Sequence, residues 1–178
     1  MKKKIFFGSF ALVLSGIVGF ILYAMTQLTI QALISCSANT GGIRIPSSVC
    51  EYYMLNYRLT EEDIASLREG AGLGYILNGQ DPEKHRIAEI FISHGLDING
   101  INHYGNQDLT PLHGSALMGD IKTLQFLLRH GADIHIKSNQ YETALELAKK
   151  FHKANDKLRD RTEIIRLLSD AEAQHVRE

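Results

Sequence analysis

A short motif that returns after 33 residues constrains this chain more than any other feature. Its first copy opens at Thr110-Pro111-Leu112-His113, and its second copy opens at Thr143-Ala144-Leu145-Glu146. Further upstream, Gly95-Leu96-Asp97-Ile98-Asn99 matches Gly131-Ala132-Asp133-Ile134-His135 at a spacing of 36 residues, so three additional residues lie between these anchors. Anchors that stay in phase over this length are typical of a stacked repeat array.

The residue types within one copy predict two short antiparallel helices. Thr110 suits the N-cap, and Pro111 suits the first helical position, where its missing N–H costs nothing. Gly119 and Gly131 suit the C-terminal caps of the two helices. The expected core positions recur at helical spacing; they are Leu112, Ala116, Leu124, Leu127 and Leu128. One such pair cannot bury its own apolar face, so neighbouring pairs must stack into a solenoid.

The Thr-Pro-Leu-His motif, the cap glycines and the 33-residue period together resemble the ankyrin repeat. The resemblance implies an all-α ankyrin-repeat solenoid over residues 51–178, with about three repeats and irregular caps. It also implies a protein-binding module without catalysis, in which His113 hydrogen-bonds the backbone of the turn. Thr60-Glu61-Glu62-Asp63 has the pattern of a capping box, which predicts one further helix ahead of the repeats.

The N-terminus predicts a membrane segment. Lys2, Lys3 and Lys4 precede a 21-residue apolar run over residues 5–25, and no charged residue occurs between Ile5 and Ile43. About 20 apolar residues in a helix span the hydrocarbon core of a bilayer. The lysines favour a cytoplasmic tail over residues 1–4, which places the chain after Met25 on the opposite side.

Two alternatives to a transmembrane helix stay open. One is a secretory signal that is cleaved, although such signals have shorter apolar runs. The other is a bacterial lipoprotein, because Leu33-Ile34-Ser35-Cys36 resembles a lipoprotein box with Cys36 as the acylated residue. The favoured interpretation is a single-pass protein of a bacterial inner membrane, with its C-terminal domain in the periplasm.

Residues 26–50 are expected to form a linker between the membrane segment and the repeats. This linker holds both cysteines of the chain, Cys36 and Cys50, which an oxidising compartment would allow to pair. In the chain-entropy model, closing a loop of about 15 residues stabilises a fold by ~3 kcal/mol. Acylation of Cys36 would instead leave Cys50 unpaired.

Next comes an aromatic segment with Tyr52, Tyr53 and Tyr57. It is read either as the cover of the apolar end of the solenoid or as an adhesive face, since tyrosine is enriched in binding hot spots.

Charge and motifs limit the function classes. All 20 acidic residues follow position 50, where 15 Lys and Arg accompany them, so this part has a net charge near −5. Such a balance argues against nucleic-acid binding, which relies on clustered positive charge. The basic residues between Lys149 and Arg161 are read as a solvated terminal helix, or else as a docking face. No metal-ligand spacing, nucleophile motif or phosphate loop occurs, so we expect no enzyme, metal, cofactor or small-molecule substrate.

The ankyrin resemblance implies that a protein partner binds the turn tips and the ends of the first helices. Carried onto this sequence, these positions are His103, Tyr104, Asn106, Gln107, Asp108, Leu109, Leu117, Met118, Asn139, Gln140, Glu142, Lys150 and Phe151. Leu117-Met118 is an apolar pair at a place that is usually exposed, unless a neighbouring repeat or cap buries it. Asn106-Gln107-Asp108 are the additional residues that lengthen one tip.

Architecture of this kind resembles that of small anchored immunity proteins, which neutralise secreted antibacterial toxins. The expected function is therefore a displayed binding module that occludes a phospholipase-type effector. A periplasmic scaffold or stress-protective accessory that stabilises a partner enzyme is the alternative, and a structural subunit of an envelope complex is a third class.

Overall fold

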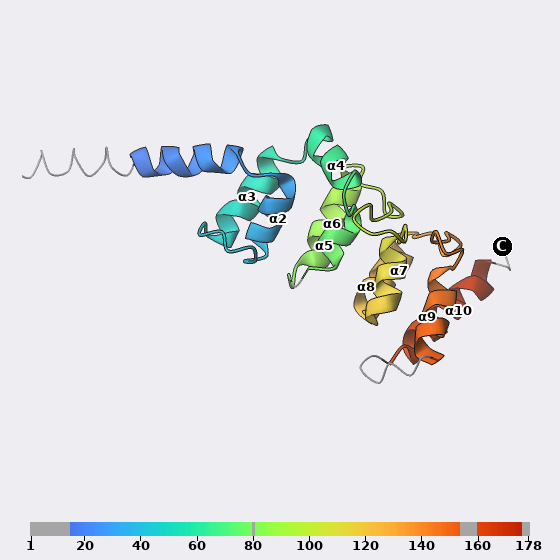
Figure 1. Cartoon of the computed structure of the whole chain (residues 1–178). Helices are drawn as coiled ribbons and strands as arrows, with labels where there is room; N and C mark the ends of the chain where they lie inside the picture. The colour runs from blue at the N-terminus through green and yellow to red at the C-terminus, as the bar shows by residue number, and fades with distance from the viewer. Residues whose placement is uncertain (1–14, 80, 154–159, 176–178) are drawn as a thin grey trace, which may run out of the picture. The chain divides into compact units, whose positions relative to one another are not determined.

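The computed structural model describes residues 15–79, 81–153 and 160–175, and within these residues every regular element is a helix. The chain divides into two compact units, Met1–Arg58 and Leu59–Glu178 (Figure 1). The expected all-α architecture is therefore confirmed for the described residues.

The first unit contains a helix over residues 15–26, followed by α2 (Ile30–Ser37) and α3 (Ser47–Tyr57). Thr29 caps α2, because its side chain accepts a hydrogen bond from the Ala32 N–H at 3.2 Å. The two labelled helices pack together as a hairpin. A small apolar core holds them; its buried members include Met25, Ile30, Leu33, Ile34 and Met54.

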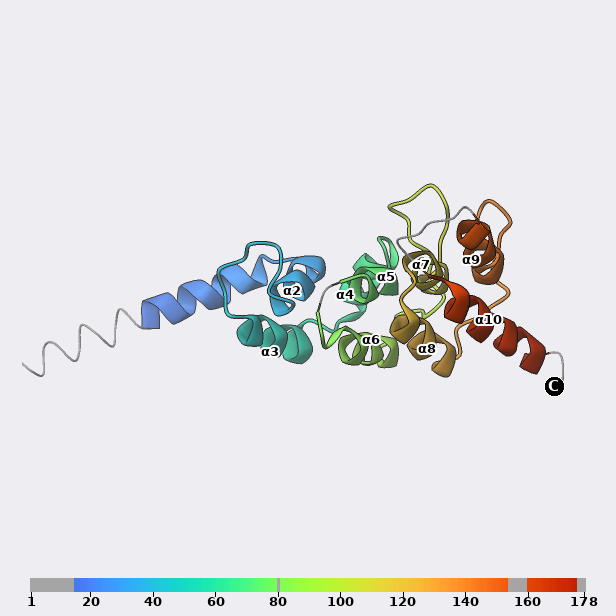
Figure 2. The ribbon, with the colours of Figure 1, turned by 90° about the horizontal axis from the view of Figure 1, so that it is seen from below.

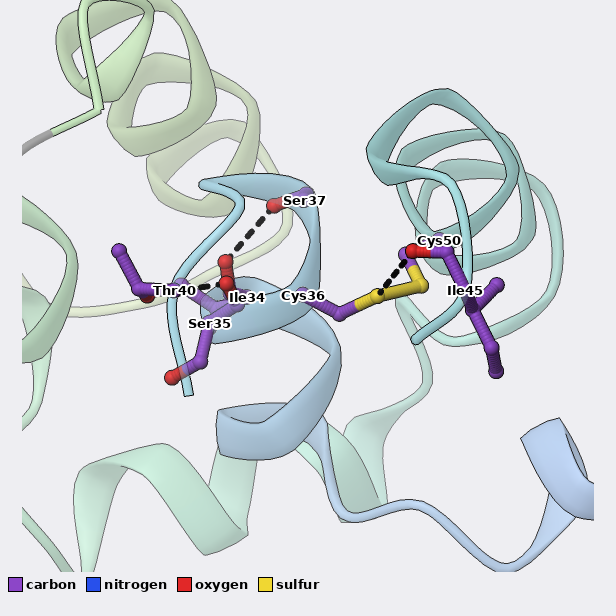
Figure 3. Close-up of a disulfide and its surroundings, with 7 residues drawn as sticks. All are labelled: Ile34, Ser35, Cys36, Ser37, Thr40, Ile45 and Cys50. Carbon is purple, nitrogen blue, oxygen red and sulfur yellow. Dashed lines mark hydrogen bonds between the residues drawn. A yellow bond between two sulfur atoms is a disulfide. The ribbon is translucent and has the colours of Figure 1, made fainter. Parts of the chain in front are cut away.

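A disulfide between Cys36 and Cys50 joins α2 to α3, with 5.9 Å between the two Cα atoms (Figure 3). The segment expected to be a linker over residues 26–50 is thus folded. It contains Ser, Gly and Asn, as linkers do, but Ile30, Leu33 and Ile34 lie at helical spacing and bury one face of α2. The disulfide occupies the Cys36 sulfur that a lipoprotein would acylate.

The transmembrane helix expected over residues 5–25 falls partly outside the described residues. Residues 15–26 are helical, whereas the lysine tail and residues 5–14 belong to the part that the structure does not describe. Across residues 15–79, 81–153 and 160–175, no helix has both the length and the apolar character needed to cross a bilayer.

Seven labelled helices make up the described part of the second unit. They are α4 (Glu61–Arg68), α5 (Leu73–Leu77), α6 (Lys84–Ser93), α7 (Pro111–Met118), α8 (Ile121–Arg129), α9 (Ala144–Lys153) and α10 (Thr162–His175). Three pairs pack in succession: α5 with α6, α7 with α8, and α9 with α10. Helix α7 also packs on α5 and α9, so the pairs stack as a solenoid (Figure 2).

The ends of these helices follow the sequence signals. The Thr60 side chain accepts from the Asp63 N–H and caps α4, ahead of the three pairs. Gly119 follows α7 with a φ of 70°, and Gly131 follows α8 with a φ of 78°, both in the left-handed region that glycine tolerates. Leu127 is fully buried, as expected, whereas Leu128 is only partly buried.

Candidate partner-binding surface

Two turns form the tips of the stacked pairs, one before α7 and one before α9. In the first, the Asn102 N–H donates to the Leu109 carbonyl at 3.0 Å, and in the second the Ser138 N–H donates to the Glu142 carbonyl at 2.9 Å. The tips lie side by side, because the Asn139 N–H donates to the Gln107 carbonyl at 3.2 Å.

The additional residues of the first tip are tied down in the same way. The Asn139 side-chain amide donates to the Asn106 carbonyl, beside the Gln107 contact. On the other flank, the His103 N–H donates to the Gly70 carbonyl at 2.9 Å. Seven side chains predicted as partner contacts are exposed at these tips: His103, Tyr104, Asn106, Gln107, Asp108, Asn139 and Gln140. The inserted loop is therefore a supported part of one continuous surface.

A small cavity of about 50 Å³ connects the tips with the ends of α7 and α9. Its lining brings together six predicted contacts, namely Gln107, Leu109, Leu117, Gln140, Lys150 and Phe151, together with Ser138 and Leu147. Lys150 forms an ion pair with Glu142, with 2.9 Å between Nζ and Oε1. The cavity therefore has apolar lining from Leu109, Leu117, Leu147 and Phe151, and a charged pair at its rim.

Met118 lies apart from this cavity, although it follows Leu117 directly. Consecutive helical residues point in different directions, and Met118 is 53% exposed beside a larger cavity of about 520 Å³. There Lys84 Nζ lies 2.8 Å from Asp120 Oδ2. Burial acts to raise the pKa of Asp120, but hydrogen bonds from Lys84 and Thr123 outweigh it and lower the pKa to about 2. The predicted apolar pair is thus divided between two hollows.

His113 serves the framework of the turn, as the resemblance implied. The Thr110 N–H donates to His113 Nδ1 at 3.3 Å, so the proton lies on Nε2, which donates to the Glu142 carbonyl at 3.0 Å. Burial lowers the pKa of His113, while the bond to Glu142 opposes that shift. The imidazole is therefore neutral and occupied by structural hydrogen bonds.

Arg161 was expected in a solvated terminal helix or a docking face, and the structure contradicts both because it is buried. Helix α9 ends at Lys153, and Arg161 precedes α10 with only 2% of its surface exposed. Its guanidinium donates to the Leu117 carbonyl at 2.6 Å and lies 5.8 Å from the centroid of the Phe151 ring. Arg161 thereby fixes the end of α7 against α9, and no local sequence pattern indicates this long-range contact.

Tyr141 is an exposed residue of the second tip that is not among the predicted contacts. It is 82% exposed and has a φ of 62°, a left-handed conformation that is strained for a bulky side chain. Asp108 has a φ of 49° at the equivalent place in the other tip, two residues before the capping threonine. Ankyrin repeats, which this sequence resembles, have a turn glycine two residues before the threonine, so counting two residues back from Thr143 would have indicated Tyr141.

Comparison with known proteins identifies the repeat that carries this surface. Residues 107–139 match the family model of the ankyrin repeat. The match begins within the first tip, includes α7 and α8, and ends in the second tip. The ankyrin repeat indicates a protein–protein interaction module, and such modules are in general not catalysts.

Two known proteins are similar to part of this chain. Alpha-latroinsectotoxin-Lt1a of Latrodectus tredecimguttatus is 34% identical over 62 residues, which is 35% of this chain and 4% of the toxin. The DNA-binding protein RFXANK of Homo sapiens is 42% identical over 50 residues, which is 28% of this chain and 19% of that protein. The matched region thus covers a small part of both relatives.

Proposed function

We propose that this protein binds a protein partner through its turn tips and the neighbouring ends of α7 and α9, and acts by covering that partner. One observation carries the proposal: the stacked repeats bring six separately predicted contacts around a single cavity beside exposed tyrosine and amide side chains. Tyr141 supports it, because strained residues that persist on a surface are commonly functional.

We further propose that the N-terminal helix anchors the chain in a membrane. Exposed apolar side chains surround the helix over residues 15–26; they include Ile17, Val18, Phe20 and Leu22. A helix that is apolar on all sides needs lipid or protein around it. Lys2, Lys3 and Lys4 favour a cytoplasmic start, which puts the repeats in the periplasm of a bacterial cell. The Cys36–Cys50 disulfide supports a periplasmic location, since disulfides persist in oxidising compartments.

The partner class follows from the anchored architecture. An immunity protein held at the outer side of the inner membrane would meet a secreted phospholipase-type effector where that effector attacks lipid. Blocking requires only a tight surface over the effector's active site, and the tips supply such a surface. The net charge near −5 after position 50 favours a partner with a basic face.

The test compares protection by the full chain with protection by two variants. Cells that receive a phospholipase-type effector should survive with the parent protein and die with Leu117→Glu/Met118→Lys. The matched control is Gln125→Glu/Gln174→Lys, which makes the same charge changes at exposed positions of α8 and α10 and should protect. All three proteins must show equal membrane levels and melting temperatures.

Two results would count against this function. Equal protection by Leu117→Glu/Met118→Lys would exclude this surface as the binding site. Absence of protection by the parent protein, with a periplasmic enzyme retained and stabilised by it instead, would favour a scaffold or accessory role.

A further inference from the structure

Helix α3 carries three tyrosines, Tyr52, Tyr53 and Tyr57, which we name the tyrosine cluster. The ring centroids of Tyr53 and Tyr57 are 5.5 Å apart, and those of Tyr52 and Tyr57 are 6.4 Å apart. Tyr52 and Tyr57 are 62% and 61% exposed. Two of the three adjacent rings are thus largely uncovered within the first unit, and Tyr53 is partly buried beside them.

The tyrosine cluster lies beside the place where the apolar helix ends. The Arg58 guanidinium, directly after Tyr57, donates to the Leu28 carbonyl at 2.7 Å. Leu28 follows the helix over residues 15–26 by two positions, and Met25 at the end of that helix is fully buried. Figures 1 and 2 both show this helix extending away from the hairpin of α2 and α3.

The hairpin that carries the cluster is held in shape. The Cys36–Cys50 disulfide ties α2 to α3 (Figure 3), and buried Met54 packs on the inner side of α3. The Ser37 hydroxyl donates to the Ile34 carbonyl at 2.8 Å, which closes the end of α2. The tyrosines are therefore presented by a rigid support next to the exit of the helix.

We infer that the tyrosine cluster docks on the phospholipid headgroup layer and holds α3 against the membrane surface. This inference rests on the proposed membrane anchor. Tyrosine prefers the boundary between hydrocarbon and water, where its ring is apolar and its hydroxyl is hydrated. A bilayer around the apolar helix would have its boundary at the end of that helix, beside Tyr57.

The distribution of net charge along the chain favours a lipid surface as the partner of the tyrosine cluster. Between residues 26 and 58 the charged residues are Arg44, Glu51 and Arg58, a net charge of +1, whereas residues 59–178 hold 14 basic and 19 acidic residues, a net charge of −5. Anionic headgroups attract basic segments near the bilayer and repel acidic ones. The first unit is thus the part of the chain suited to the surface.

The experiment uses tryptophan fluorescence, because the natural sequence contains no tryptophan. Full-length Tyr57→Trp is reconstituted in vesicles of phosphatidylcholine and phosphatidylglycerol, whose lipids carry bromine near the headgroup or near the end of the acyl chain. We expect a blue-shifted emission and a loss of intensity that is stronger with bromine near the headgroup. Full-length Tyr141→Trp, at an exposed site of the acidic unit, is the control and should stay unquenched.

Flotation of the vesicles separates this inference from the anchor itself. Flotation together with quenching of Tyr57→Trp supports the membrane anchor and the docking of the tyrosine cluster. Flotation without quenching overturns the docking but leaves the anchor in place. Failure to float overturns the anchor and the inference together. Tyr52→Trp is the second reporter if Tyr57→Trp does not fold, and quenching by neither reporter in floated vesicles overturns the docking of α3.

Discussion

At the scale of single residues, the two turns use different side chains to accept a hydrogen bond from the N–H of the capping threonine. In the first turn His113 Nδ1 accepts from the Thr110 N–H, and in the second Glu146 accepts from the Thr143 N–H at 2.8 Å. The hydrogen bond from Thr143 lowers the pKa of Glu146. Either acceptor fits because the turn needs only a lone pair three residues after the capping threonine. The shared motif therefore predicts the turn without predicting a shared chemistry.

His113→Ala should destabilise the repeats and weaken their sensitivity to acid. Loss of the imidazole leaves the buried Thr110 N–H without its acceptor, which costs about 1–3 kcal/mol. Since the folded pKa of His113 lies below its ordinary value of 6.5, the unfolded chain binds more protons as the pH falls. The stability that the neutral, buried imidazole of His113 contributes is complete above pH 6.5. It is lost as the pH falls through 6.5 toward the folded pKa.

Denaturant unfolding of the parent and of His113→Ala checks both parts of this prediction. The variant should show a lower free energy of unfolding near neutral pH and a smaller further loss toward pH about 5. Exposed His103→Ala is the control and should behave like the parent. Parallel pH curves for parent and His113→Ala would contradict a buried neutral imidazole.

Tyr141→Gly should separate stability from binding. The left-handed backbone of Tyr141 costs roughly 1–2 kcal/mol for a residue with a side chain, and glycine removes that strain. The greater flexibility of glycine in the unfolded chain destabilises the fold by about 0.5–1 kcal/mol and offsets part of this gain. The free energy of unfolding should therefore rise slightly or stay level. Partner affinity should fall if the exposed ring makes contact. If Tyr141→Gly binds the effector as tightly as the parent protein does, Tyr141 is not part of the partner-binding surface.

At the scale of helices, the phase of α8 was accessible from sequence because apolar spacing and burial agree. Leu124 and Leu127 of α8 are fully buried, and α8 has its N-cap at Asp120, whose side chain accepts from the Thr123 N–H. Leu127→Ala should therefore lower the free energy of unfolding by about 2–5 kcal/mol, through lost burial and a new cavity. Leu128→Ala, one position away and only partly buried, should cost less. Equal melting temperatures for the two variants would show that the phase is wrong.

The cap at the end of α8 offers a matched pair of glycines. Gly131 has a φ of 78°, with no atom within 4 Å of an added Cβ, and Gly105 has similar free space without a left-handed backbone. Gly131→Val should thus be less stable than Gly105→Val by roughly 1–2 kcal/mol, since only the first forces a branched residue into the left-handed region. Thermal unfolding of the two variants measures the difference, and equal values would contradict the assigned cap.

Other elements could not be derived because their determinants are distant in sequence. The contact between Arg161 and the Leu117 carbonyl joins residues 44 positions apart, and no sequence pattern distinguishes Arg161 from the exposed Lys149 and Lys150 earlier in the same basic run. Helix α2 was hidden by the Ser, Gly and Asn content of its surroundings, although its apolar spacing was present. Composition describes a segment on average, whereas burial depends on which face meets a neighbour.

At the scale of the whole molecule, the chain divides into a unit stabilised by a cross-link and a unit stabilised by stacking. The first has few core residues and a disulfide, and the second repeats one helix pair so that each pair covers the next. Helix-pair stacking follows from a sequence period, so the repeat architecture could be predicted. The fold of Met1–Arg58 has no period to reveal it, and the two cysteines were its main signal.

Removal of the cross-link should therefore affect one unit alone. In Cys36→Ser/Cys50→Ser, the first unit should lose about 3 kcal/mol of stability, because the unfolded loop regains its freedom. The stacked helices have no share in that loop, so their hydrogen-exchange protection around Leu127 should match the parent, while protection around Met54 falls. A loss of protection at both places would show that the units unfold together. The side of the membrane is checked on the parent protein: its thiol labelling in intact cells should fail until a reductant is added, as expected for a disulfide formed in the periplasm. The variant has no cysteine and is the unlabelled control.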